Sequence, residues 1–266
     1  MRGARRAFTY MVLLGFGALG FSGLTAVASA TPTITAKATI VPIPINPRKA
    51  NGPTYPGTGD MLGAPAALEI EGKISGSEYG GFPSPLKQVK VFLPKGVKVS
   101  ESGFARCSES VLRASGPAGC PLRSIASAPG EATGAVSFGG ERVHERVTVQ
   151  AFFNSEGGLI FSIVGTTPVS LEEFATLTFA DGSAGQIATA EIPLIETVPG
   201  ALAASAEQFK IKLGAAFKEG KKLVSFGTVP NTCKNGFTAK VEVSFYSGET
   251  VPLSVTVPCP KGARRG

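Results

Sequence analysis

Apolar and polar residues alternate along many short stretches of the chain from residue 66 onward. The alternation is clearest over residues 68–75, 89–93 and 208–213, where every second side chain is apolar and most of those between are polar. A period of two is typical of a strand with one buried face and one solvated face. Because parallel strands are usually covered on both faces, the solvated face predicts antiparallel sheet.

One hairpin can be predicted with its register. Residues 143–153 and 159–165 flank a loop at residues 154–158, which is rich in small and polar residues. A five-residue loop there pairs Phe153 with Leu159 and Val149 with Ile163, and it places the odd-numbered side chains of both strands on one face.

The last hairpin requires a different connection. Its odd-numbered positions are mostly apolar on both strands, so two odd positions must face each other: Phe237, Val241, Val243, Phe245, Val251, Leu253, Val255 and Val257. A two-residue turn at Ser247-Gly248 would instead place apolar residues opposite polar ones. We therefore predict a three-residue loop or a bulge at this turn.

The pattern as a whole predicts an all-β protein. About ten strands follow one another at short spacing, and the longest amphipathic helical stretch lies around Ser108–Arg113. These features are typical of an antiparallel two-sheet β-sandwich, which we expect over residues 66–260, with a second small subdomain as the alternative.

The segment before the sandwich has a different composition. Residues 41–65 contain six Pro and four Gly, and proline favours extended conformations that lack ladder hydrogen bonds. We expect a Pro/Gly-rich arm over residues 31–65; the sequence leaves open whether Thr35–Ile40 joins the main sheet.

The first 30 residues have the three parts of a signal peptide. A basic start with Arg2, Arg5 and Arg6 precedes an uncharged apolar run from Ala7 to Val27, and Ala28-Ser29-Ala30 offers small residues for cleavage. A retained membrane anchor is the alternative. The mature protein is therefore expected to be extracellular or in the cell envelope, without a membrane span; the export route, general secretory or twin-arginine, is left open.

The net charge of +7 is concentrated at the chain ends. Three arginines lie in the predicted signal peptide, and Lys261, Arg264 and Arg265 lie in a basic tail at residues 261–266. The body between them is nearly neutral. A nucleic-acid partner is therefore not expected, because it requires basic residues gathered on one surface.

The four cysteines predict two disulfides, as is usual in an exported chain. Of the three possible pairings we expect Cys107–Cys120 and Cys233–Cys259, because each joins the two ends of a local excursion. A zinc site is the rival interpretation, but the spacings contain no C-x-x-C pair.

No motif in the sequence identifies a reaction, a metal or a cofactor. His144 is the only histidine, and the alternation places it with Arg146, Thr148 and Gln150 on a solvated strand face. A G-x-S-x-G nucleophile elbow and a D-x-D-x-D calcium loop are both absent from the sequence. We therefore expect no catalytic, metal-binding or cofactor-binding residue.

The order of motifs between about residues 66 and 260 resembles the repeat units of uncharacterised, exported actinobacterial surface proteins. The matching segments are Leu93-Pro94-Lys95-Gly96, Cys120-Pro121 with Ser124-Ile125-Ala126, Val229-Pro230-Asn231-Thr232-Cys233, and Cys259-Pro260. Ala126 stands where the pattern has Gly. The resemblance implies a secreted, β-rich module stabilised by disulfides, and it implies no activity.

Three functions remain open from the sequence. The first is a non-catalytic secreted or cell-envelope module that contacts a protein or cell-wall partner. The second is a carrier that holds a small apolar ligand between its sheets, which would require an internal cavity. The third is an extracellular hydrolase acting through a pair of glutamates, which would require two carboxylates facing each other across a cleft.

The signal-peptide interpretation predicts the start of the secreted protein. Cleavage after Ala30 should yield a chain that begins at or near Thr31. Intact-mass measurement of protein collected from the medium checks this, with protein retained in the cells as the reference for the unprocessed chain. Secreted protein that still carries Met1 would contradict the interpretation.

Overall fold

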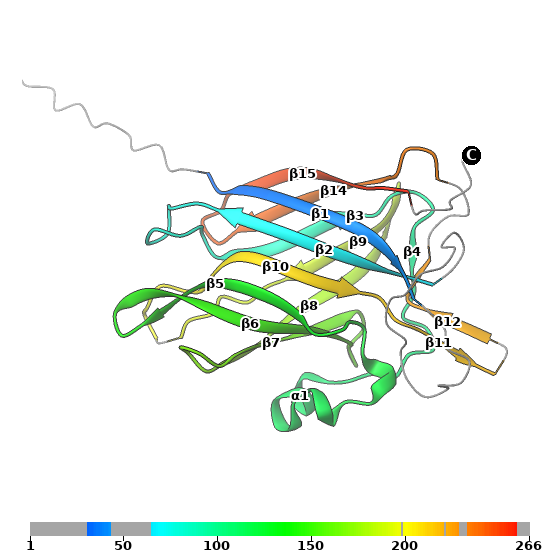
Figure 1. Ribbon diagram of the computed structural model, residues 1–266, viewed down its shortest axis with the longest axis horizontal. Coiled ribbons are helices and arrows are strands. Elements are labelled where there is room, and N and C mark those ends of the chain that lie inside the picture. Colours follow the sequence, from blue (N-terminus) through cyan, green and yellow to red (C-terminus); the bar gives the residue numbers. More distant parts are fainter. Residues whose placement is uncertain (1–30, 44–64, 198, 221, 229–232, 260–266) are drawn as a thin grey trace, which may run out of the picture.

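The computed structural model describes residues 31–43, 65–197, 199–220, 222–228 and 233–259 (Figure 1). The predicted signal peptide, the basic tail, Val229–Thr232 and most of the predicted arm lie outside the described residues. The start of the predicted arm is described by the structure. Its residues Thr33–Pro42 form strand β1 of the main sheet. The sequence left open whether Thr35–Ile40 joins the main sheet, and the structure places these residues in it, with Ala36, Ala38 and Ile40 packed in the core.

The main sheet has 11 strands, and every neighbouring pair in it is antiparallel. In spatial order they are β1, β2 (Ala66–Ser75), β10 (Ser205–Leu213), β5 (Gly130–Phe138), β6 (Glu141–Phe153), β7 (Leu159–Gly165), β8 (Leu171–Gly182), β9 (Gly185–Glu191), β3 (Leu86–Phe92), β14 (Phe237–Phe245) and β15 (Thr250–Val257). Two small strand pairs accompany it: β11 (Ala216–Glu219) with β12 (Lys222–Ser225), and β4 (Lys98–Val99) with β13 (Gly227–Thr228).

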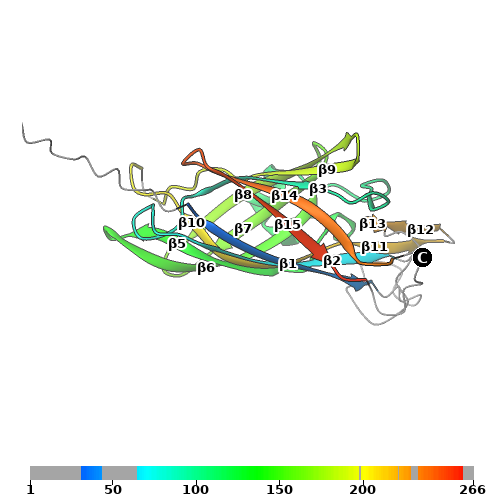
Figure 2. The ribbon, with the colours of Figure 1, turned by 90° about the horizontal axis from the view of Figure 1, so that it is seen from above.

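The sheet rolls up until its first and last strands lie side by side (Figures 1 and 2). The prediction of an antiparallel all-β fold is confirmed, but the two separate sheets of a sandwich are replaced by one nearly closed, barrel-like sheet. The reason is the strand order: hydrogen bonding continues without a break from β1 to β15, and within the described residues only the seam between these two strands lacks ladder pairing.

Both predicted hairpin registers are confirmed. Phe153 pairs with Leu159, and Val149 pairs with Ile163. In the last hairpin Ser244 pairs with Thr250, and the amide of Phe245 donates to the carbonyl of Glu249 at 2.9 Å. The loop therefore has three residues, and it ends at Gly248, whose φ of 93° suits glycine.

Near the seam the interior is filled by side chains from the two ends of the strand order. Ile74 of β2 packs with Val243 and Phe245 of β14, and all three are at most 5% exposed. Further along, Ala38 of β1 packs with Val255 of β15. The alternation of the sequence thus places one apolar face of every strand inward.

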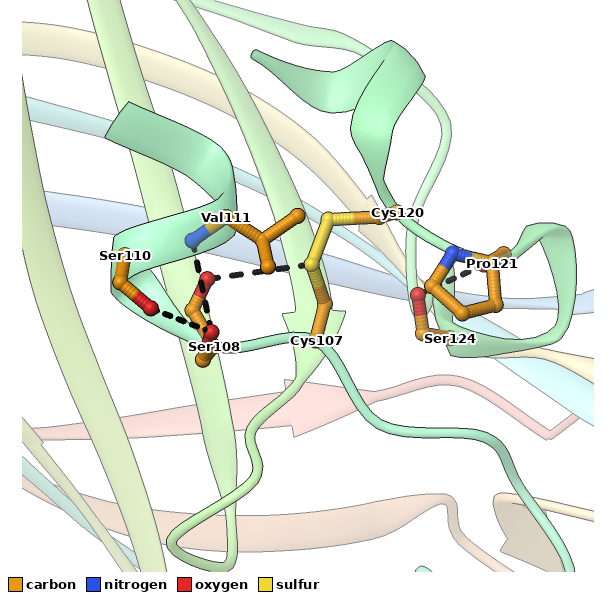
Figure 3. The surroundings of a disulfide bond; sticks show 7 residues. All are labelled: Cys107, Ser108, Ser110, Val111, Cys120, Pro121 and Ser124. Carbon is orange, nitrogen blue, oxygen red and sulfur yellow. Dashed lines mark hydrogen bonds between the residues drawn. A yellow bond between two sulfur atoms is a disulfide. The ribbon is translucent and has the colours of Figure 1, made fainter. Parts of the chain in front are cut away.

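A helical excursion covers part of the outside. Helix α1 (Glu109–Ser115) begins at Ser108, whose hydroxyl accepts from the amide of Val111 (Figure 3). Two short 3₁₀ turns follow, at Pro117–Gly119 and Leu122–Ser124. No helix in the described part of the chain is both long and apolar enough to cross a membrane.

Both expected disulfides are present, Cys107–Cys120 and Cys233–Cys259. The first holds the α1 excursion against the outward apolar residues of β6, β7 and β8, which are Phe152, Ile160 and Phe174. The outer surface around these three residues is therefore covered, whereas that of β1, β2, β10 and β5 carries polar side chains.

A close contact inside the sheet gives a prediction. Gly72 of β2 pairs with Phe209 of β10, and the phenyl ring lies where a Cβ on residue 72 would be. Gly72→Ala should therefore destabilise the fold by about 1–3 kcal/mol through overpacking. Urea unfolding of the single variants and of the double variant with Phe209→Ala measures the coupling. Equal effects of Gly72→Ala in both backgrounds would contradict the contact.

Candidate functional site

Two rows of outward side chains cross β1, β2, β10 and β5, which lie side by side in the front layer of Figure 1. The charged row consists of Lys37, Glu71, Lys210 and Glu131, each opposite the next across the strands. The mixed row consists of Thr35, Lys73, Gln208, Thr133 and, on β6, Arg146. Together with Glu69 and Lys212 these side chains form what we call the polar face.

A groove of about 540 Å³ lies between the two rows. The residue between the rows on each strand points inward, so the floor of the groove is strand backbone at Ala36, Gly72, Phe209 and Ala132. The inward residues of β14 and β15 do not line this cavity. The groove is therefore an open feature of the outer surface and not a chamber inside the sheet.

Ion pairs order one side of the polar face. The Nζ atom of Lys210 bonds to Glu71 and lies 3.2 Å from Glu69, and that of Lys212 also lies 3.2 Å from Glu69. Desolvation raises the pKa of Glu69, but hydrogen bonds and charge from Lys210 and Lys212 outweigh it, so the pKa is lowered overall. Hydrogen bonds to Glu71 and Glu69 raise the pKa of Lys210. The lowered pKa of Glu69 and the raised pKa of Lys210 both favour the charged forms that make the ion pair.

The other cations of the polar face have no such partner. Lys37, Lys73 and Arg146 are exposed, and none forms an ion pair with another residue in the described ranges. The same holds for the carboxylate of Glu131. Lys37, Lys73 and the carboxylate of Glu131 thus remain available to a ligand in the groove, and Arg146 lies next to it on β6, opposite Thr133.

An aromatic and basic cluster lies beyond the end of the mixed row. The guanidinium of Arg142 donates to the carbonyl of Ala203 and to the hydroxyl of Ser205, both at 2.7 Å. It also lies over the rings of Tyr79 and Phe82 at 5.5 and 5.3 Å. Burial lowers the pKa of Arg142, while Tyr79 and the nearby Glu207 partly oppose the change. Arg142 thus holds the segment that leads into β10 against β6.

His144 lies in the same neighbourhood and faces solvent, as the alternation predicts. Its side chain is 71% exposed, its Nδ1 atom lies 2.9 Å from a carboxylate oxygen of Glu207, and its ring meets the edge of Phe82. Among the described residues its hydrogen-bond partner is this carboxylate and no hydroxyl group. Within the described ranges, His144 therefore has no hydrogen-bonded hydroxyl or thiol group that it could activate as a nucleophile.

Glu145 is a buried carboxylate that we did not single out from the sequence. It is 2% exposed and points inward from β6. One oxygen accepts from the amide of Val169 at 3.0 Å, and the other lies against Gly165 without a hydrogen-bond partner among the described residues. The sequence contained a signal for this burial, because odd-numbered positions of this strand point inward and residue 145 is one of them. Its structural role is to hold the loop between β7 and β8.

The described residues contain no group of three or more His, Cys, Asp or Glu side chains placed to hold a metal ion. Of the two aspartates in the chain, Asp181 is exposed near the end of β8, and Asp60 lies outside the described residues. The structure instead brings together the side chains of the polar face, which come from strands that are distant in sequence.

No protein-family model matches this chain, no curated protein matches its sequence, and no solved structure matches it. The arrangement of the polar face is thus the basis for a functional assignment.

Glu145 generates a stability prediction. Glu145→Ala should cost about 1–2 kcal/mol, because the half-buried amide of Val169 loses its acceptor. Glu145→Gln keeps an oxygen acceptor for this amide at nearly the same side-chain volume, so it should be much less destabilising. Glu131→Ala, on the polar face, is the matched control and should change stability by no more than about 0.5 kcal/mol. Chemical unfolding that gives Glu145→Ala and Glu131→Ala the same stability would contradict the assigned role.

Proposed function

We propose that the protein is a non-catalytic, secreted or cell-envelope module that binds a cell-wall partner through the groove of the polar face. The observation that carries this proposal is the groove itself, a cavity open to solvent between two rows of hydrogen-bonding and charged side chains. Ion pairs hold Lys210 and Glu71 in place before binding, which lowers the entropic cost of association for these two groups.

Two further features support an extracellular role. The sequence begins with the three parts of an export signal. The disulfides are compatible with an oxidising environment, where such bonds persist. The resemblance to exported surface-protein repeats points the same way.

The two alternatives receive less support. A carrier needs an apolar chamber, but Ile74, Val243 and Phe245 pack together in the interior, next to the seam where the sheet closes. A glutamate-dependent hydrolase needs two facing carboxylates, and Glu145 is bonded to a backbone amide and faces the apolar interior.

A bulky residue in the groove tests the proposal without changing its charge. Gln208 is exposed in the middle of the mixed row, and tryptophan is well tolerated in strands, so Gln208→Trp should fill the groove and leave the fold intact. Binding of the purified protein to insoluble cell-wall material, measured by co-sedimentation, should weaken at least tenfold. Ser254→Trp, on an exposed outward position of β15, is the control and should bind like the original protein.

The outcome is decisive in both directions. Equal wall binding by the original protein and both folded variants would reject the groove as the binding site. Hydrolysis of ester, peptide or glycoside substrates that disappears in His144→Ala or Glu145→Gln would reject the non-catalytic function.

A further inference from the structure

We propose that the groove binds a linear, hydroxyl-rich wall polymer whose negative charges are phosphodiesters. This inference rests on the proposed function and adds the chemical class of the ligand. Three observations support it. They are the balance of paired and unpaired charges on the polar face, the spacing of the unpaired cations, and the kinds of side chain that lie between them.

The charge balance along the groove favours an anion. The ammonium groups of Lys210 and Lys212 are held by Glu69 and Glu71. Lys37, Lys73 and Arg146 are exposed and make no ion pair within the described part of the chain, and Glu131 alone opposes them. An anionic ligand that crosses the strands would therefore meet a local excess of positive charge.

The spacing of the cations favours a chain over a small anion. Lys73 on β2 and Arg146 on β6 are separated by β10 and β5, which corresponds to about 14 Å at the usual distance of nearly 5 Å between strands. Gln208 and Thr133 lie between them in the mixed row. A polymer with anionic groups separated by hydroxyl-bearing units matches this sequence of cation, amide, hydroxyl and cation.

The composition of the face disfavours a protein partner. Every outward side chain of the two rows is Thr, Lys, Glu, Gln or Arg. Protein interfaces usually have apolar or aromatic residues at the centre, and these residues supply most of the binding energy. Polymers of hydroxyl and phosphate groups need no such centre.

The kinds of cation suit phosphate groups. Two of the three unpaired cations are lysines, whose compact ammonium groups bind phosphate oxygens as point charges. Arg146 at the end of the row can bind a phosphate or a carboxylate group.

Calorimetric titration with defined polymers tests the inference. The probes are soluble poly(glycerol phosphate), poly-L-glutamate, polygalacturonate and dextran of matched length. Poly(glycerol phosphate) should bind, and its affinity should fall with added salt because the contacts are ionic. The double variant Lys73→Glu/Arg146→Glu should lose at least tenfold in affinity, while Lys90→Glu/Lys240→Glu, on β3 and β14, should bind like the original protein.

Three results would overturn the inference. Poly-L-glutamate or polygalacturonate binding as tightly as poly(glycerol phosphate) would indicate a site for carboxylates or acidic peptides. Dextran binding as tightly would indicate a site for neutral glycans. Affinity that is unchanged in the folded Lys73→Glu/Arg146→Glu variant, judged by an unchanged unfolding midpoint, would place the contact elsewhere.

The experiments distinguish a wrong polymer class from a wrong binding site. If Gln208→Trp weakens wall binding but poly(glycerol phosphate) does not bind, the groove is the binding site and only the polymer class is wrong. If Gln208→Trp leaves wall binding unchanged, the binding function of the groove itself is rejected.

Discussion

The inward side chains of β1 and β2 pack against those of β14 and β15, and this contact between the two ends of the chain determines the shape of the molecule. It brings the first and last strands of the sheet together and buries Ile74, Val243 and Phe245. Because side chains alternate along a strand, burial of one face fixes which residues point outward on all neighbouring strands. The rows of the polar face are therefore a consequence of how the core is packed.

The outer surface of the rolled sheet is divided into regions of different character. Over β6, β7 and β8 the outward residues include Phe152, Ile160 and Phe174, and the α1 excursion covers them with the help of the Cys107–Cys120 disulfide. Over β1, β2, β10 and β5 the outward residues are polar and surround an open groove. The apolar region is thus used for stability, which leaves the polar region available for a partner.

Local features of this fold were predictable from the sequence, and its closure was not. Strand alternation, the two hairpin registers and the cysteine pairing depend on segments close in sequence, and each is confirmed. The insertion of β10 between β2 and β5 depends on contacts between distant segments, so the opposition of Lys210 to Glu71 could not be foreseen. The contacts of Arg142 could not be predicted for the same reason. The burial of Glu145 could have been predicted, because it is an acidic residue at an inward position of the alternation.

Mapping of amide chemical shifts on the isotope-labelled protein, titrated with solubilised cell-wall fragments, tests most directly whether the groove on the outside of the sheet is the functional surface. The largest changes should occur in the three-residue segments that line the groove, at residues 35–37, 71–73, 131–133 and 208–210. Changes concentrated at inward residues such as Val243 and Phe245 would show that the ligand enters the interior, and changes concentrated on α1 would place binding on the covered side; either result would contradict the binding surface derived from the fold.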